Sequence, residues 1–373
     1  NFLGFGPQYD SGAYSGSFQQ SNSGGNLNLK PELKTEIEIG TDLEFYNRLK
    51  LSATYYTNNT KDLLISAPLS GSSTFTSLYG NYAKIENKGI ELEFDAGILS
   101  SKSEFKWNIY GNWSTNKNEV TELTGTNSLF LNGFTGSSSR AVLGQPLGVL
   151  WGGKFERDAN GNLVLDANGF PTASDTEGVI GDPNPKWRGG LGTSIEYKNF
   201  KISTLFDASI GGDLWDGTNG ALNVFGKSME TGNEVTLTAP TVNYAGDVIP
   251  AGTTVRGNLK DFGGGTVLLD ESWYSDLGGG FGPVSEQFIK SATWIKWREL
   301  TFSYKLDLKG KNILGFESAT FSATGRNLWL WTEDKTLGQD PETNLTGGSN
   351  GRGLQYFNSP NSKSLIFSIH LKF

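Results

Sequence analysis

The sequence predicts an all-β protein, a segment of an antiparallel β-barrel that spans a membrane. Three observations predict it. Apolar and polar residues alternate with a period of two in about nine segments. The apolar stripes are about 9 to 11 residues long, which is the length of tilted strand that crosses a bilayer. The connections are short and long in turn, which is typical of barrels with short periplasmic turns and long extracellular loops.

The alternation of apolar and polar residues is clearest in the first predicted hairpin. Residues 35–45 alternate apolar side chains on one face with mainly acidic side chains on the other, and the alternation resumes at Leu49. If residues 46–48 form a three-residue loop, Phe45 lies opposite Leu49 and apolar side chains face each other. A two-residue loop would set Phe45 against Lys50 and mix the faces. The sequence therefore predicts the three-residue loop.

Seven further strands follow. A two-residue turn at 198–199 again pairs like side chains across a hairpin. In one strand the phase breaks, because Lys296 and Arg298 occupy positions that are apolar in its other half; a bulge near Arg298 or Glu299 reconciles the two halves. The seven strands are predicted at 90–98, 105–114, 191–197, 200–210, about 295–306, 319–323 and 366–373.

The connections define the organisation of the chain. Residues 1–31 are rich in Gly, Ser, Asn and Gln and show no period, so they predict an extracellular loop before a barrel segment over 32–373. Long outer loops are expected at about 116–186 and 211–287. About nine strands is an odd number with two open edges, so the rest of the barrel is expected to come from elsewhere.

Composition excludes several classes of protein. The chain has 373 residues, a net charge of -8 and no Cys, so thiol chemistry and disulfides are absent and nucleic acid is a poor partner. No apolar run reaches 18 residues, which excludes transmembrane helices. A single His, His370, and no nucleophile elbow indicate that the chain is not an enzyme.

Cofactor and metal sites are not predicted. The segment Asp158–Asn162 is similar to the start of a calcium loop, but its Gly comes too early and no Glu closes the loop at the required spacing. A hairpin turn at Asn160-Gly161 explains it. The glycine clusters at 263–265 and 278–280 do not lie between a strand and a helix, so flexible loops are predicted there rather than phosphate sites.

Three groups of residues are candidates for function. Sugar rings stack on aromatic faces, so tryptophans in or beside the outer loops are candidates for contact with a substrate or a lid: Trp151, Trp187, Trp215 and Trp273. Acidic residues in the polar phase are expected to face the barrel lumen: Glu36, Glu38, Asp42, Glu91, Glu93 and Asp207. The last alternating strand is similar to the signal that outer-membrane barrels present for assembly: Phe367, Ile369, Leu371 and Phe373.

An ordered set of short motifs over nearly the whole chain resembles the SusC/RagA-like TonB-dependent transporters of Bacteroidetes outer membranes. It begins with Asn28-Leu29-Lys30-Pro31-Glu32 and includes Gly181-Asp182-Pro183-Asn184-Pro185-Lys186-Trp187. The other matches are Asp62–Leu64, Asn87–Glu91, Gly144–Gly148, Gly325–Leu328, Asp340–Glu342 and the terminal Phe373.

The resemblance implies a 22-strand barrel, of which this chain is the C-terminal part, in the bacterial outer membrane. It also implies an N-terminal plug and barrel portion missing from this sequence, a SusD-like surface lipoprotein as lid, and the TonB complex acting through the missing part. Such proteins import oligosaccharides or peptides. Two alternatives stay open: a passive or adhesive outer-membrane barrel, and a soluble β-rich carbohydrate-binding module.

Overall fold

The computed structural model describes residues 3–5, 18–20, 22–70, 72–73, 75–99, 103–309, 315–347 and 351–373. Nine long strands form one antiparallel sheet in which neighbours in sequence are neighbours in space. The strands are β4 (Leu33–Phe45), β5 (Leu49–Pro68), β6 (Ser77–Gly97), β7 (Phe105–Leu123), β12 (Trp187–Tyr197), β13 (Phe200–Ile210), β22 (Trp294–Asp307), β23 (Ser318–Thr332) and β25 (Ser364–Lys372). The predicted architecture of about nine strands is confirmed.

The predicted hairpin registers are also confirmed. Phe45 pairs with Leu49 across a three-residue loop, and Tyr197 pairs with Phe200 across a two-residue turn. The positive φ of Tyr46, Asn47 and Lys198 closes these turns. Like side chains therefore face each other along both hairpins.

The bulge in β22 lies where the broken phase predicts it. Leu205 pairs with Glu299 whereas Phe206 pairs with Trp297, so Arg298 is the extra residue. The pairing of β22 with β23 shifts at the same point. The extra residue lets Lys296, Arg298 and Glu299 share one face of the sheet, although their spacing is not a multiple of two.

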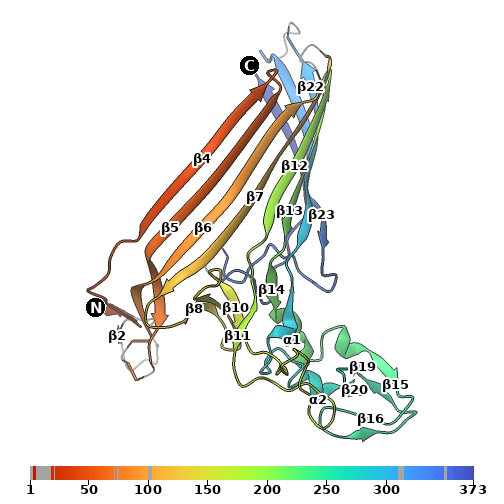
Figure 1. Ribbon diagram of the computed structural model, residues 1–373. Helices are drawn as coiled ribbons and strands as arrows, with labels where there is room; N and C mark the ends of the chain where they lie inside the picture. The colour runs from red at the N-terminus through yellow and green to blue at the C-terminus, as the bar shows by residue number, and fades with distance from the viewer. Residues whose placement is uncertain are drawn as a thin grey trace, which may run out of the picture.

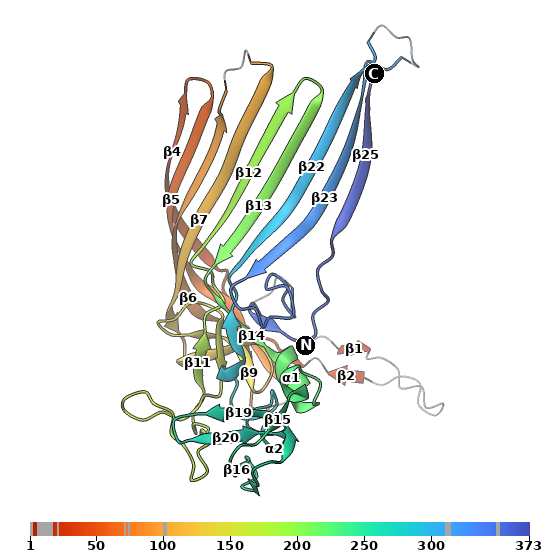
Figure 2. The same cartoon turned by 90° about the vertical axis from the view of Figure 1, so that its right-hand side faces the viewer.

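The short turns at 46–48 and 198–199 lie at one end of the sheet, and the long connections, where the structure describes them, lie at the other (Figures 1 and 2). We call these the turn end and the loop end. The C-terminus lies at the turn end. The turns around 100–102 and 310–314 lie partly outside the described residues.

Several strands are longer than the sequence predicted. β6 begins at Ser77, well before the predicted strand start at 90, and β7 continues to Leu123, past the predicted start of the outer loop at 116. Residues 116–119 are polar, so their side chains carry no alternation, but their backbone still pairs with β6. The strands stay paired beyond the apolar stripe because their hydrogen bonds join backbone groups and do not require apolar side chains.

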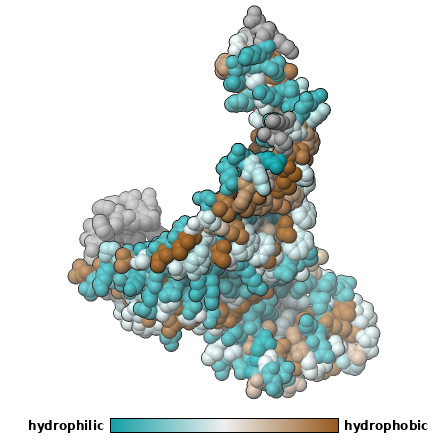
Figure 3. Space-filling view, turned by 45° about the horizontal axis from the view of Figure 1, so that its top comes forward, coloured by the Kyte–Doolittle hydropathy of each residue, from teal (hydrophilic) through white to brown (hydrophobic). Residues whose placement is uncertain are grey.

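The sheet has one apolar face, and no described segment covers it. Ile37, Leu92, Ile202 and Phe367 are 62, 43, 45 and 75% exposed. Figure 3 shows hydrophobic surface running along the strands. A soluble sandwich would bury these side chains under a second layer, whereas a barrel wall turns them to lipid.

The sheet bends like part of a barrel wall (Figures 1 and 2). Among the residues that the structure describes, no helix has the length and apolar character needed to span a bilayer.

The loop end carries small sheets and short helices that the sequence did not predict. The helices are α1 (Gly217–Val224), η1 (Glu230–Gly232), α2 (Glu271–Tyr274) and η2 (Glu286–Phe288). The short strands are β1 (Leu3–Phe5), β2 (Phe18–Gln20), β3 (Ser23–Gly24), β8 (Ser128–Gly133), β9 (Ser137–Val142), β10 (Val149–Gly152), β11 (Gly178–Gly181), β14 (Asp213–Asp216), β15 (Glu234–Thr236), β16 (Thr241–Val242), β17 (Val248–Ile249), β18 (Thr254–Arg256), β19 (Asn258–Asp261), β20 (Thr266–Leu269), β21 (Ile289–Ser291) and β24 (Leu354–Gln355).

Three of these strands lie within the predicted loop over residues 1–31. β1 pairs with β2, and β3 pairs with β6. Residues 1–2, 6–17 and 21 of that loop lie outside the described residues.

Glycines 278–280 pack tightly, which corrects the expectation of a flexible loop. A Cβ on Gly280 would lie 2.6 Å from the Cα of Gly220 in α1. A Cβ on Gly278 would meet the indole of Trp273 at 2.0 Å. These glycines are therefore required for close approach, since a side chain at Gly280 would push the segment after α2 away from α1 and one at Gly278 would collide with Trp273.

Candidate functional site

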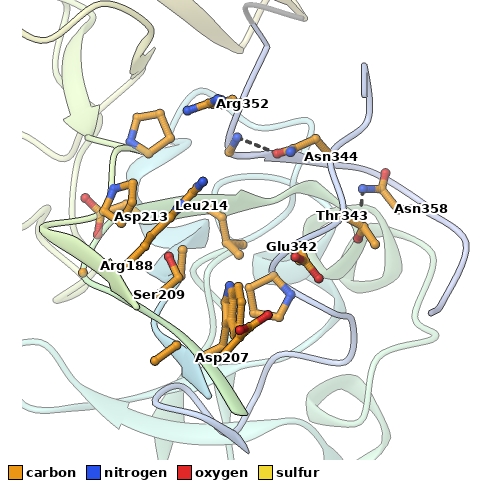
Figure 4. A pocket seen from close by; sticks show the side chains of 18 of the residues that line it. Arg188, Asp207, Ser209, Asp213, Leu214, Glu342, Thr343, Asn344, Arg352 and Asn358 are labelled. Atoms are coloured by element: carbon orange, nitrogen blue, oxygen red, sulfur yellow. Dashed lines mark hydrogen bonds between the residues drawn. The ribbon is translucent and has the colours of Figure 1, made fainter. Parts of the chain in front are cut away.

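A polar cavity of about 940 Å³ opens on the polar face of the sheet at the loop end. Its wall comes from the ends of β12, β13 and β22, and its cover comes from the connection between β23 and β25, residues 333–363. We call this connection the last outer loop. Figure 4 shows side chains from the wall and the last outer loop converging on the same space.

An ion-pair network holds the last outer loop against the wall. The ammonium of Lys296 lies 2.6 Å from Asp340 and 2.5 Å from Glu342. The guanidinium of Arg298 contacts Glu342 at 2.5 Å and Asp207 at 2.7 Å. Only 3% of the Lys296 side chain is exposed, so its charge must be paired.

The network depends on the bulge and on a turn. The bulge at Arg298 gives β22 two cations on the polar face, and Trp294 packs 4.8 Å from the Lys296 ammonium. In the loop, Asp340 accepts the backbone N–H of Glu342 at 3.0 Å, which fixes both carboxylates toward β22. Matched charges from wall and loop thus define the loop's position.

The charge state of Glu342 follows from these contacts. Burial alone would raise its pKa, but hydrogen bonds from Arg298 and Lys296 lower the pKa of Glu342 to about 2. The carboxylate therefore stays ionised throughout the physiological range.

The loop's second attachment is a backbone one. β24 pairs in parallel with β14, and the N–H of Trp215 donates to the carbonyl of Gly353 at 2.7 Å. Gly353 has φ of +75° and a Cβ there would lie 2.7 Å from Pro183, so the chain passes too close for a side chain. Behind it a buried cluster supports the cavity: Leu150, Trp215, Phe288 and Leu354.

Opposite the ion pairs, two arginines enter the cavity. Arg188 is the second residue of β12 and Arg352 precedes Gly353 in the last outer loop. Figure 4 shows both side chains at the same end of the pocket. Asp213 lies nearby; burial raises the pKa of Asp213, and its carboxylate accepts the N–H of Asp182 at 2.9 Å.

The predicted acidic residues all share the phase of the polar face. Lateral pairing runs from Asp42 through Ser52 to Glu93, then through Asn112 and Gly190 to Asp207. Three carboxylates, Asp42, Glu93 and Asp207, thus lie along one lateral row of the polar face, and Asp207 lines the cavity. Their influence on passage through the lumen stays a prediction.

The predicted tryptophans do not line the cavity. Trp215 and Trp273 are 5 and 4% exposed, and their rings pack inside the loop cores. Trp187 shares the phase of Leu191 on the apolar face. Trp151 donates to Glu177 at 2.9 Å and has Arg140 over its ring. These positions favour packing roles, and ligand contact by these residues stays a prediction.

The Asp158 turn closes a hairpin, as expected. The carboxylate of Asp158 accepts the N–H groups of Asn160 and Asn162 at 2.8 and 2.9 Å, and Arg157 pairs with Leu163. The hydrogen bond from the Asn162 side chain, together with these two backbone ones, lowers the pKa of Asp158. No group of three metal-ligating side chains occurs within the described ranges.

Sequence reasoning missed the cavity's main residues. In the sequence, Lys296 and Arg298 stand out only as a phase break, and Asp340 and Glu342 only as part of a motif. Two cations interrupting an apolar phase were the available signal, because a charge in lipid is costly and must turn inward to a partner. Arg188 and Arg352 gave no signal, since single arginines at loop boundaries are common.

A sheet with a lipid-facing side, a polar inner side and long loops at one end defines an integral outer-membrane β-barrel protein. The chain belongs to the TonB dependent receptor-like β-barrel family, whose model matches residues 3–328. The membrane location rules out the alternative of a soluble carbohydrate-binding module.

Curated relatives support the same family. The chain is 27% identical over 379 residues to TonB-dependent receptor P3 of Formosa agariphila, covering 93% of this chain and 35% of that protein. It is 23% identical over 339 residues to TonB-dependent receptor SusC of Bacteroides thetaiotaomicron, covering 85% of this chain and 30% of that protein. The chain thus spans about a third of the length of these relatives.

Among solved structures, the RagAB peptide transporter matches with a TM-score of 0.67 and 19% identity, over 100% of this chain and 38% of that chain. The "open-open" state of the RagAB peptide importer matches with a TM-score of 0.65 at the same identity. At this identity the likeness shows the fold. The predicted resemblance to SusC and RagA is confirmed.

Proposed function

We propose that this chain forms the C-terminal part of the barrel wall of a TonB-dependent importer of oligosaccharides or peptides. The observation that carries the proposal is the cavity on the lumenal face, closed over by the last outer loop through the Lys296 and Arg298 ion pairs. A passive pore has no need of a loop clamped inward over a binding-sized space. The chain's role is binding and passage, not catalysis.

The partners follow from the same proposal. A plug and further barrel strands complete the wall, because a strand edge in lipid leaves backbone groups without hydrogen bonds. A SusD-like lipoprotein covers the loop end, and the TonB complex supplies energy. Membership of the family and the relative named SusC support these assignments.

The last strand contributes to assembly in this proposal. Phe367, Ile369, Leu371 and Phe373 lie on the exposed apolar face of β25 or at its end. An alternating strand that ends in an aromatic residue is what we propose the assembly machinery reads.

Growth tests separate import from the alternatives. Cells that lack the gene are compared with parent cells on single oligosaccharides and on peptide digests as the sole carbon source. We expect the deletion to abolish growth on at least one of them, and TonB depletion to do the same. A passive barrel would keep uptake after TonB depletion, and an adhesin would leave growth unchanged; either result contradicts the proposal.

A further inference from the structure

Arg188 and Arg352 present two cationic groups to one cavity. Within the described part of the chain, no salt bridge or side-chain hydrogen bond engages either guanidinium. The charges that act on Arg188 are Arg352, which repels it, and Glu342. Because Glu342 is itself paired with Lys296 and Arg298, two like charges held near each other leave a place for an anion.

The acidic groups around the cavity do not fill this place. Glu342 is engaged by Lys296 and Arg298, and Asp207 by Arg298. Asp213 accepts a backbone N–H from Asp182. The cavity is therefore divided into an internally paired side, around Arg298, and a cationic side, at Arg188 and Arg352.

The two arginines are held by different parts of the fold. Arg188 lies between β7 and β13, paired with Ser114 and Ser209, so its backbone is fixed in the wall. Arg352 is fixed by Gly353, whose N–H donates to the side chain of Asn344 at 2.9 Å. A ligand bound by both would bridge the wall and the last outer loop.

We infer that Arg188 and Arg352 bind a carboxylate group of the transported substrate. The inference rests on the proposed import function and narrows its substrate class to carboxylate-bearing oligosaccharides or peptides. A guanidinium donates two parallel hydrogen bonds to a carboxylate, and two guanidinium groups discriminate against a neutral analogue of the same shape. Trp294, Tyr356 and Phe357 line the same cavity and supply apolar surface for the rest of the ligand.

Matched pairs of probes test the inference. The transporter is purified with its native partners in detergent and titrated calorimetrically with two pairs of probes. One pair is trigalacturonate and its methyl ester, and the other is an aspartate-containing tetrapeptide and its asparagine counterpart, both N-acetylated and C-terminally amidated so that the aspartate supplies the carboxylate of its pair. We expect the acid of one pair to bind at least about tenfold tighter than its neutral partner, because hydrogen bonds to charged groups exceed neutral ones. The pair that shows the difference identifies glycan or peptide. If neither acid exceeds its neutral partner, the inference is wrong.

Variants locate the effect. Arg352→Gln and Arg188→Gln should each weaken binding of the acid about tenfold and leave the neutral partner unchanged, whereas Arg256→Gln, in the exposed β18, should change neither. Arg352 lies in a loop, so its variant tests the site even if the Arg188 variant fails to assemble. Unchanged acid binding by Arg352→Gln would overturn the inference. TonB-dependent growth on neutral substrates with no acid preference would sink this inference while leaving the import function intact.

Discussion

The guanidinium of Arg298 and the carboxylate of Glu342 form a bidentate pair, with Nη2–Oε1 and Nη1–Oε2 distances of 2.5 and 2.9 Å. One partner is the bulge residue of a wall strand and the other lies in the last outer loop. The pair fixes both distance and orientation between them, since a planar fork meets a planar acceptor. This pair therefore joins the wall of the cavity to the last outer loop that covers it.

Replacing Glu342 should release the last outer loop. Glu342→Gln removes one counterion of the buried Lys296 and the acceptor pair for Arg298. Glu342 is 40% exposed, so we expect local opening to become easier by about 1 to 2 kcal/mol rather than the larger cost of a fully buried pair. Limited proteolysis of intact cells should then cut 333–363 about tenfold faster. Glu317→Gln, which breaks an exposed pair at the turn end, is the control.

The same contact predicts a dependence on acid. The pKa of Glu342 is lowered from 4.5 to about 2, so its ionised form stabilises the closed loop above pH 4.5. This stability is lost as the pH falls from about 4.5 toward 2. Hydrogen exchange of the loop amides, corrected for intrinsic rates, should show protection falling over that window. In the Glu342→Gln variant, loop protection should no longer fall between pH 4.5 and 2. If it still falls, another group is responsible.

Adding one methyl group at Gly280 should disorder the packing of segment 278–280 on α1. Its Cβ would lie 2.6 Å from the Cα of Gly220 and 2.9 Å from the N of Ala221, which are backbone atoms that cannot move aside. Overpacking of this kind costs about 1 to 3 kcal/mol. We expect Gly280→Ala to increase protease cleavage within 217–287. Gly232→Ala is the matched control, since nothing lies within 4 Å of its Cβ position.

A charge on the apolar face should destabilise the wall. Leu92 lies in the middle of the sheet, 43% exposed, and Leu92→Lys would place an ammonium in lipid at a cost of about 2 to 4 kcal/mol. Urea titration of the assembled barrel should show this decrease in the free energy of unfolding. Thr54→Lys, on the polar face opposite Glu91, should cost much less. Equal losses in the two variants would mean that lipid does not contact the Leu92 face.

Changing the terminal aromatic residue should impair assembly. Phe373 is 79% exposed and its ring packs 4.7 Å from Phe316. We expect Phe373→Ser to lower the amount of heat-modifiable, folded barrel in outer-membrane fractions. Phe281→Ser removes an exposed ring from an outer loop and should have no such effect. A normal amount of folded Phe373→Ser protein would argue against the assembly role.

Much of the wall was predictable because lipid and lumen impose a strict period of two. The pairing of Phe45 with Leu49 and the bulge at Arg298 both follow from keeping apolar side chains on one face. The strand ends were not predictable. Outside the bilayer neither face of a strand has to be apolar, so the alternation stops before the strand does. β7 therefore continues to Leu123 through a polar stretch that the pattern does not reveal.

The cavity was hidden from the sequence for a related reason. Asp340 and Glu342 are separated from Lys296 by more than 40 positions, and no periodicity links a loop to the strand it folds against. In the sequence, the packed glycines at 278–280 also look like a flexible linker. Their close packing depends on Gly220 and Trp273, whose positions beside them only the folded chain shows.

The sequence by itself determined the barrel wall, its lipid-facing side and the end that carries the loops, since these follow from alternation and connection length along the chain. Only the tertiary structure decided where the last outer loop lies and that Arg188 and Arg352 share one space. Such contacts depend on the folding of distant segments onto each other, which charge pairing and close packing fix in three dimensions.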